Sequence, residues 1–306
     1  MSFKILFMGT PDFAVPILKS IFDSNNKILE VYTQPPKKKN RGQKIKNSPI
    51  HDFANKLKLT VRHPDTFETN IEIDHIKKLK PDLVVVVAYG KILPRELLNF
   101  NETLFINVHA SLLPKWRGAA PIQRSIMNMD NETGVSIMKM VPKLDAGPVL
   151  LKSKISINQD TNYLELSEKM SKVGAKLLLE AIDLIKNDKA SFSEQNISEV
   201  TYAKKIQKTE SKINWNESAE KILAKINALS PNPGCWFSFL GSRIKIIKAK
   251  RVIGSGKPGE IIGDKFIIAC SKNAIQLMEL KKEGKNNIST DEFLRSNKIE
   301  IGQLLN

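Results

Sequence analysis

Residues 103–121 read TLFINVHASLLPKWRGAAP, an apolar run that leads into polar residues and then into residues that break the chain. The run predicts a short strand that the chain leaves at Asn107, with His109 two residues further on, before Pro114 and Gly118. A carboxamide and an imidazole are therefore expected just beyond a strand end. Ligands of open α/β sheets bind at such positions, so this stretch indicates a functional site.

Strands and helices alternate on both sides of this stretch. Strands are predicted at residues 3–8, 28–34, 83–87, 104–107 and 135–140. Residues 83–87, LVVVV, are typical of a parallel strand that is covered on both faces, and residues 163–185 predict a long amphipathic helix. The expected fold is α/β: right-handed βαβ units in a doubly wound, mostly parallel, Rossmann-like sheet.

The character of the sequence changes after residue 190. Residues 191–207 contain few large apolar side chains and predict a linker. Residues 208–306 contain short apolar runs separated by Gly-rich turns, which predicts a C-terminal OB-like β-barrel that is partly open. We therefore expect a first domain at residues 1–190, a linker and a smaller second domain.

The composition, 41% hydrophobic and 26% charged residues in a chain of 306, is that of a globular protein. The two cysteines, Cys235 and Cys270, are too few for a disulfide framework, and the four histidines lie far apart in sequence. We therefore expect no metal site and no disulfide-linked partner.

No apolar stretch approaches the roughly 18 residues of a membrane span, and the amino terminus is unlike a signal peptide. The expected location is cytoplasmic, without a membrane partner.

The charge is strongly positive, with 48 Lys and Arg against 32 Asp and Glu and a formal net charge of +16. Such an excess suits binding to nucleic acid, although a lysine-rich proteome would give the same composition. Residues 35–49, PPKKKNRGQKIKNSP, concentrate basic residues between prolines. This segment is either a solvated surface loop or a contact for a polyanion, and charge alone leaves both open.

Four motifs occur in order along the chain: NVH at residues 107–109, SLLP at 111–114, WRGAAP at 116–121 and DAGP at 145–148. Together they resemble the motifs of the 10-formyltetrahydrofolate-dependent formyltransferases. Within that superfamily the chain resembles, over nearly its full length, the methionyl-tRNA formyltransferases. The resemblance implies transfer of a formyl group from 10-formyltetrahydrofolate to the free amino group of methionyl-tRNA(fMet) for translation initiation.

The resemblance also implies the catalytic residues Asn107, His109 and Asp145. The first two are suitable donors to the negative charge that develops on the formyl oxygen. Asp145, expected to face the same crevice, would hold or charge the imidazole and help to accept the proton that the amine loses. An α-amino group has a reference pKa of about 8, so a useful neutral fraction exists near pH 7 without a strong base.

Further contacts are implied for both substrates. Ser111, Leu112, Leu113 and Pro114 would contact the folate, the alternative being a loop that packs on the core. For initiator tRNA, the resemblance implies a basic loop that enters the acceptor stem and a C-terminal barrel that touches the tRNA. The candidate residues are Lys38, Lys39, Arg41, Lys44, Arg243 and Lys245. In a regular strand Lys245 would not share a face with Lys248 and Lys250, so the sequence does not establish a continuous basic stripe.

Other functions remain open from the sequence. A formyltransferase for a sugar-nucleotide amine would share the chemistry of the first domain without needing so basic a second one. Glycinamide ribonucleotide transformylase would be shorter and lack the second domain. A non-catalytic RNA-binding protein on this scaffold is the alternative of another class, and the intact set of Asn107, His109 and Asp145 argues against it. Salt dependence of tRNA binding separates the RNA-binding readings from the sugar-nucleotide one.

Overall fold

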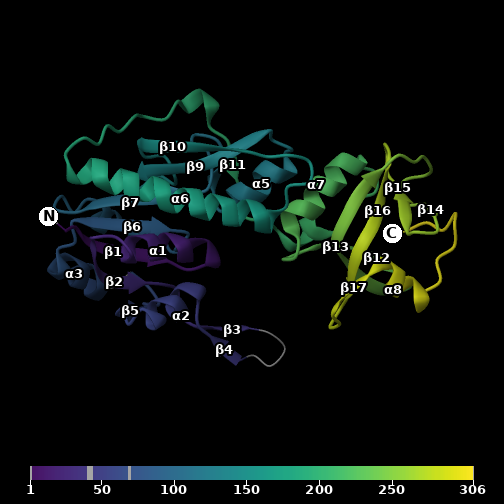
Figure 1. The fold of residues 1–306 in the computed structure, drawn as a ribbon, viewed down its shortest axis with the longest axis horizontal. Coiled ribbons are helices and arrows are strands. Elements are labelled where there is room, and N and C mark those ends of the chain that lie inside the picture. The colour runs from purple at the N-terminus through teal and green to yellow at the C-terminus, as the bar shows by residue number, and fades with distance from the viewer. Residues whose placement is uncertain (1, 40–43, 68–69, 306) are drawn as a thin grey trace. The chain divides into compact units, whose positions relative to one another are not determined.

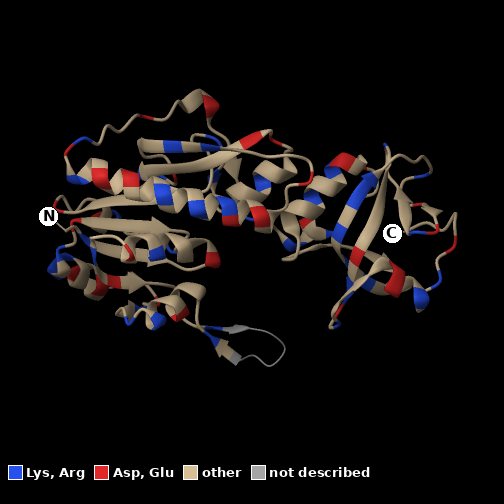
Figure 2. Cartoon of the chain, viewed as in Figure 1, with Lys and Arg blue, Asp and Glu red and all other residues tan. Residues whose placement is uncertain are grey.

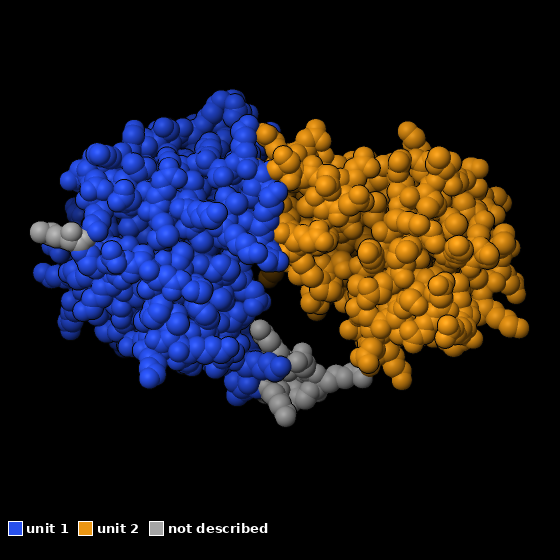
Figure 3. Space-filling model, viewed as in Figure 1, with its two compact units in different colours: residues 1–118, 134–155, 167–202 blue, residues 119–133, 156–166, 203–306 orange. Residues whose placement is uncertain are grey.

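The computed structural model describes residues 2–39, 44–67 and 70–305 of the chain (Figure 1). The chain forms two compact units, which Figure 3 shows in blue and orange. Unit 1 consists of Met1–Gly118, Gly134–Ile155 and Ser167–Tyr202. Unit 2 consists of Ala119–Thr133, Ser156–Leu166 and Ala203–Asn306.

A seven-stranded sheet with the order β10-β9-β7-β6-β1-β2-β5 forms the centre of the first part of the chain. Its strands are β1 Lys4–Gly9, β2 Lys27–Tyr32, β5 Val61–Arg62, β6 Leu83–Val87, β7 Leu104–His109, β9 Glu132–Lys139 and β10 Val149–Ser156. The neighbours from β7 to β5 pair in parallel, and β9 pairs with β7 in the antiparallel sense. The predicted α/β fold with a mostly parallel sheet is confirmed.

Strand β6 lies in the middle of this sheet, and all five of its residues are buried. Val84 and Val86 belong to a core that also contains residues of α3 (Asn70–Leu79) and α4 (Arg95–Leu98). On α6 (Tyr163–Lys186), a Cβ added at Gly174 would lie 3.2 Å from Val108 Cγ1, so the helix backbone approaches the sheet closely there. The apolar run LVVVV was therefore read correctly as a strand that is covered on both faces.

Strand β7 extends further than the sequence predicted. We expected the chain to leave the strand at Asn107, but the strand continues to His109. The parallel partner β6 pairs with β7 as far as Asn107, whereas the antiparallel partner β9 continues and places Ser136 opposite His109. Alternate residues of a strand point to the same face. Asn107 and His109 therefore project from one face of the sheet at its end.

Two further helices and a short hairpin belong to unit 1. Their bounds are α1 Val15–Phe22 and α2 Pro49–Lys56, with the hairpin strands β3 Lys37–Lys39 and β4 Lys44–Lys46. Helix α5, Pro121–Met127, belongs to unit 2. The hairpin lies in the basic segment 35–49, where the sequence predicted only a loop. Pro49 begins α2 because Ser48 caps that helix, accepting a hydrogen bond from the His51 N–H.

Unit 2 contains an antiparallel sheet with the path β12-β13-β16-β15-β14, and β17 pairs with β16. The elements are β12 Cys235–Phe239, β13 Ser242–Val252, β14 Ile261–Gly263, β15 Ile267–Ala269, β16 Ala274–Lys282, β17 Asn287–Ser289, α7 Ala219–Leu229 and α8 Thr290–Arg295. Phe237, Phe239, Phe266 and Phe293 pack ring against ring inside it. The predicted C-terminal β domain is confirmed, and its strand path is open over the residues that the structure describes.

Two observations on the described residues concern membrane-spanning helices and disulfides. In those ranges, each helix is too short or too polar to traverse a lipid bilayer. Cys235 and Cys270 are both buried free thiols, and burial raises the pKa of each to about 12.

We predict that replacing Leu6 by Ala lowers the free energy of unfolding by about 2–5 kcal/mol, because Leu6 is fully buried in the core beside β6. Chemical denaturation measures the change. The control is Ile92→Ala, since Ile92 is 94% exposed and its truncation should have little effect. Equal effects of the two substitutions would contradict the assignment of the core.

Candidate active site

The structure brings Asn107, His109 and Asp145 together. Asn107 Nδ2 lies 3.5 Å from Asp145 Oδ1, and His109 Nδ1 lies 3.8 Å from Asp145 Oδ2. Asn107 and His109 come from the end of β7, and Asp145 comes from the loop between β9 and β10. The side chains of His109 and Asp145 are 7% and 12% exposed. A carboxamide, an imidazole and a carboxylate therefore meet in a site from which most water is excluded.

The orientation of His109 follows from its neighbours. Its Nε2 lies 3.0 Å from the backbone oxygen of Trp116. A carbonyl oxygen only accepts hydrogen bonds, so Nε2 must carry the hydrogen. The distance of 3.8 Å from Nδ1 to Asp145 is longer than a hydrogen bond. Nδ1 is therefore the ring nitrogen that remains available to a substrate, on the edge that faces the carboxylate.

The loop that carries Asp145 is tightly constrained. Asp145 has φ +47°, a left-handed conformation that is uncommon for residues other than glycine. The Gly118 N–H donates a hydrogen bond of 2.8 Å to Asp145 Oδ2. At Gly147, a Cβ would lie 1.9 Å from the Lys139 carbonyl oxygen, so only glycine fits. The loop therefore holds the carboxylate in one place.

Gln195 is part of this site, although no motif or periodicity in the sequence points to it. Its Nε2 donates hydrogen bonds to the backbone oxygens of Asp145, at 2.9 Å, and Gly147, at 2.7 Å. It lies in the segment 191–207, which has no periodicity and was expected to be a linker. Arg117, which the sequence analysis left without a role, donates to Gln195 Oε1.

Two family models cover most of the chain. The model described as "Formyl transferase" matches residues 3–182, and "Formyl transferase, C-terminal domain" matches residues 205–298. The methionyl-tRNA formyltransferase of Pelagibacter ubique (strain HTCC1062) is 48% identical over 304 residues, which cover 99% of this chain and 98% of that protein. The methionyl-tRNA formyltransferase of Chelativorans sp. (strain BNC1) is 40% identical over 310 residues and covers 100% of both chains.

The chain belongs to the methionyl-tRNA formyltransferase family. It is a formyltransferase, and the formyl donor of this family is 10-formyltetrahydrofolate. A solved structure with a similar fold is an N-formyltransferase from Helicobacter canadensis in complex with folinic acid and dTDP-3-aminofucose. Its TM-score is 0.70 at 21% identity, and the match covers 90% of this chain and 99% of that one. At this identity the likeness concerns the fold.

The donor set at the end of β7 fits the formyl group that formyltransferases transfer. The group offers one carbonyl oxygen, and two side chains on one face of the strand can donate to it: the Asn107 amide, and His109 through Nδ1 when the imidazole carries a second proton beside Asp145. The Asn107 hydrogen bond to Asp145 is long, at 3.5 Å, so the amide is not strongly engaged within the protein. The four histidines form no cluster with acidic residues or cysteines that could hold a metal ion, within the described ranges.

The segment expected to contact the folate is packed into the protein. Ser111 is fully buried and Leu113 is 1% exposed, whereas Leu112 is half-buried. Ser136 Oγ accepts from the Leu113 N–H and donates to the Ser111 carbonyl oxygen. Contact with a ligand through this segment would therefore involve Leu112 and the backbone more than the Ser111 and Leu113 side chains.

The candidate tRNA contacts lie on two different sheets. Arg243 and Lys245 are in β13 of unit 2. Lys38 and Lys39 are in β3 and Lys44 is in β4 of the basic hairpin, while Arg41 lies outside the described residues.

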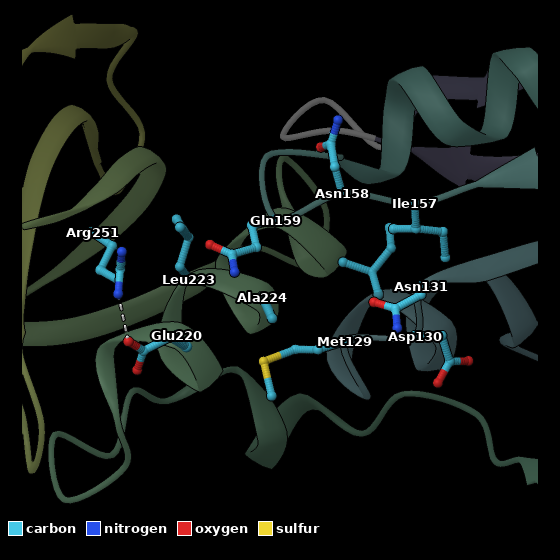
Figure 4. A pocket seen from close by; sticks show the side chains of 11 residues that line it. Met129, Asp130, Asn131, Ile157, Asn158, Gln159, Glu220, Leu223, Ala224 and Arg251 are labelled. Atoms are coloured by element: carbon cyan, nitrogen blue, oxygen red, sulfur yellow. Dashed lines mark hydrogen bonds and ion pairs between the residues drawn. The ribbon is translucent and has the colours of Figure 1, made fainter.

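A cavity of about 380 Å³ in unit 2 contains none of the three catalytic candidates (Figure 4). Its wall is partly apolar, with Met129, Leu223 and Ala224, and Glu220 forms an ion pair of 2.9 Å with Arg251. Burial opposes ionisation of Glu220, but hydrogen bonds from its own backbone N–H, Arg251 and other neighbours lower its pKa to about 2. The carboxylate is thus fully engaged within the protein, and the reaction centre of a formyltransferase is better placed at the end of β7.

We predict that Gly147→Ala lowers the rate of formyl transfer by about 10- to 100-fold, because the added methyl group must displace the Asp145 loop. The measurement is turnover with saturating 10-formyltetrahydrofolate and amine acceptor. The control is Gly263→Ala in unit 2, since a Cβ added at Gly263 would meet only the flexible Ile267 side chain, at 3.1 Å or more. Full activity of the Gly147 variant would contradict the role of this loop.

Proposed function

We propose that this chain transfers the formyl group of 10-formyltetrahydrofolate to the α-amino group of methionyl-tRNA(fMet) for translation initiation. The observation that carries the proposal is identity of 48% to a methionyl-tRNA formyltransferase over 99% of this chain. The convergence of Asn107, His109 and Asp145 supports it. Because the acceptor is a charged tRNA, we place the chain in the cytoplasm.

Each of the three side chains has a separate role in the reaction. The bound folate supplies the formyl carbonyl, and the acceptor supplies a neutral amine, whose reference pKa of about 8 leaves a useful fraction unprotonated near pH 7. Asn107 Nδ2–H and His109 Nδ1–H donate hydrogen bonds to the formyl oxygen as negative charge develops on it. Asp145, 3.8 Å from Nδ1, stabilises the charged imidazole and receives the proton that the amine loses as its nitrogen bonds to the formyl carbon. The bond from the formyl carbon to N10 of the folate then breaks, and N10 takes up that proton.

We assign separate roles to three parts of the chain. Residues 1–190 carry the chemistry, residues 208–306 bind tRNA, and residues 191–207 join them and supply Gln195 to the site. The support for a tRNA-binding second domain is the basic surface of β13, where Figure 2 shows lysine and arginine along the strand.

An irregularity in the pairing of β13 with β16 aligns these basic residues. The buried residues of the strand are Ile244, Ile246 and Ala249, and the pairing shifts register on both sides of Lys248. The two shifts cancel, so the pairing resumes in its original register, but the buried positions of β13 change from even-numbered to odd-numbered residues across the irregularity. Lys248 and Lys250 therefore share the outer face with Arg243 and Lys245, which regular alternation along the sequence would not allow.

The same surface combines cationic groups with an aromatic ring. A cavity of about 380 Å³ in unit 2 is lined in part by Lys208, Trp236, Arg243, Lys245, Lys281 and Lys282. The Arg243 guanidinium lies 4.0 Å from the centre of the Trp236 ring. Burial, and then the charge of Lys281, lower the pKa of Lys245, which indicates that positive charge is crowded here. Phosphate groups of RNA would relieve this repulsion.

We predict that His109→Ala lowers turnover by about 10²- to 10³-fold with both substrates saturating, because one donor to the formyl oxygen is lost. Purified protein is incubated with labelled 10-formyltetrahydrofolate and charged initiator tRNA, with free methionine and amino sugars as competitors. The matched control is His63→Ala, since His63 is exposed, follows edge strand β5 and stacks on His51 of α2, away from β7. Near-normal turnover of the His109 variant, or preferred formylation of an amino sugar, would contradict the proposal.

We predict that Arg243→Ala weakens tRNA binding and reduces the slope of log affinity against log salt by about 1, because one phosphate contact is lost. Turnover at saturating tRNA should be unchanged. Titration of tRNA at several salt concentrations measures the slope, and Lys189→Ala, at an exposed lysine of unit 1, is the control. An unchanged slope and affinity for the Arg243 variant would remove this residue from the tRNA surface.

A further inference from the structure

We propose that Arg117 and Gln195 are positioning residues, which together hold the Asp145 loop in its reactive conformation through a chain of hydrogen bonds. The inference deepens the proposed function, on which it rests for the reaction that is assayed. Neither residue touches a substrate in this account. Both act through Asp145.

Gln195 uses both ends of its carboxamide. Its Oε1 accepts two hydrogen bonds from Arg117, at 3.0 Å from Nε and 2.8 Å from Nη2. Its Nε2 donates two hydrogen bonds, at 2.9 Å to the Asp145 carbonyl oxygen and at 2.7 Å to that of Gly147. A carboxamide has two N–H donors, and both are thereby engaged by the backbone of one loop.

The charge of Arg117 strengthens this chain. Arg117 is 4% exposed and Gln195 is 9% exposed, so the hydrogen bonds form away from solvent. The guanidinium donates here to a neutral amide, which does not cancel its charge. A cation at Oε1 polarises the carboxamide and makes its N–H groups stronger donors, and such cooperativity is greater at low dielectric. The positive charge of Arg117 is thus conveyed to the carbonyl oxygens of Asp145 and Gly147.

The loop needs this support because its backbone is strained. Asp145 has φ +47°, a left-handed conformation that is uncommon for a residue with a side chain. Gln195 fixes the Asp145 carbonyl, and the Gly118 N–H fixes the carboxylate at 2.8 Å. The Arg117 N–H is itself anchored to the Thr201 carbonyl oxygen at 2.9 Å. Arg117 and Gly118 therefore hold Asp145 from two sides, one through Gln195 and the other directly.

The test variant is Gln195→Glu. The new carboxylate keeps the size of the side chain and still accepts from Arg117, but it cannot donate to the two carbonyl oxygens and instead repels them. We expect kcat for formylation of charged initiator tRNA to fall by about 10- to 100-fold, with little change in KM for tRNA. The control is Glu194→Gln at the exposed neighbour, which should keep wild-type kcat.

A double-mutant cycle with Asp145→Asn separates positioning from general stability. If Gln195 acts through Asp145, then Gln195→Glu should change the residual rate of the Asp145→Asn protein by less than about threefold. A merely structural role predicts the full loss in both backgrounds, and that result would overturn the proposal. If Gln195→Glu fails to fold, Arg117→Lys replaces it in the same cycle, because lysine keeps the charge and loses the paired N–H groups.

The outcomes also separate this inference from the function on which it rests. Wild-type protein that does not formylate methionyl-tRNA contradicts the proposed function. Wild-type protein that does, together with folded Gln195→Glu and Arg117→Lys proteins of unchanged kcat, contradicts the positioning role alone.

Discussion

The hydrogen bond from the Gly118 N–H to Asp145 Oδ2, at 2.8 Å, joins the two segments from which the site is built. Asn107 and His109 belong to one segment, which continues from β7 to Gly118, and Asp145 belongs to the loop before β10. Without this bond the carboxylate would be free to turn toward solvent, and the imidazole would lose the charge beside its Nδ1. The direction of the carboxylate therefore depends on one backbone donor at a glycine, while Gln195 holds the backbone of the same loop.

The strand pairing in the sheet places Asn107 and His109 where they can contact Asp145. Because β9 pairs with β7 beyond the end of β6, the strand stays extended through His109, and two residues of alternate position project from one face. The Trp116 carbonyl then fixes the imidazole, which leaves Nδ1 toward Asp145. A fold that buries β6 completely provides the rigid support for these side chains, as preorganised donors require.

The sequence predicted the features that depend on local pattern. The run LVVVV predicted the central strand, and the alternation of apolar segments predicted the α/β sheet and the second β domain. Asn107, His109 and Asp145 were predicted as catalytic through the resemblance that their ordered motifs carry, and the structure brings them together. The predicted end of β7 was wrong because antiparallel pairing with β9 extends the strand to His109, and this long-range contact leaves no local sequence pattern. Gln195 has no local signal, since its role consists of hydrogen bonds to residues about 50 positions away. The irregularity in β13 likewise depends on its partner strand.

The most direct measurement of the central claim is a structure of this protein with folinic acid, a stable formylated folate. We predict that the formyl oxygen lies about 3 Å from both Asn107 Nδ2 and His109 Nδ1, with Asp145 still bound to the Gly118 N–H. A formyl group bound far from the end of β7, or facing neither donor, would contradict it.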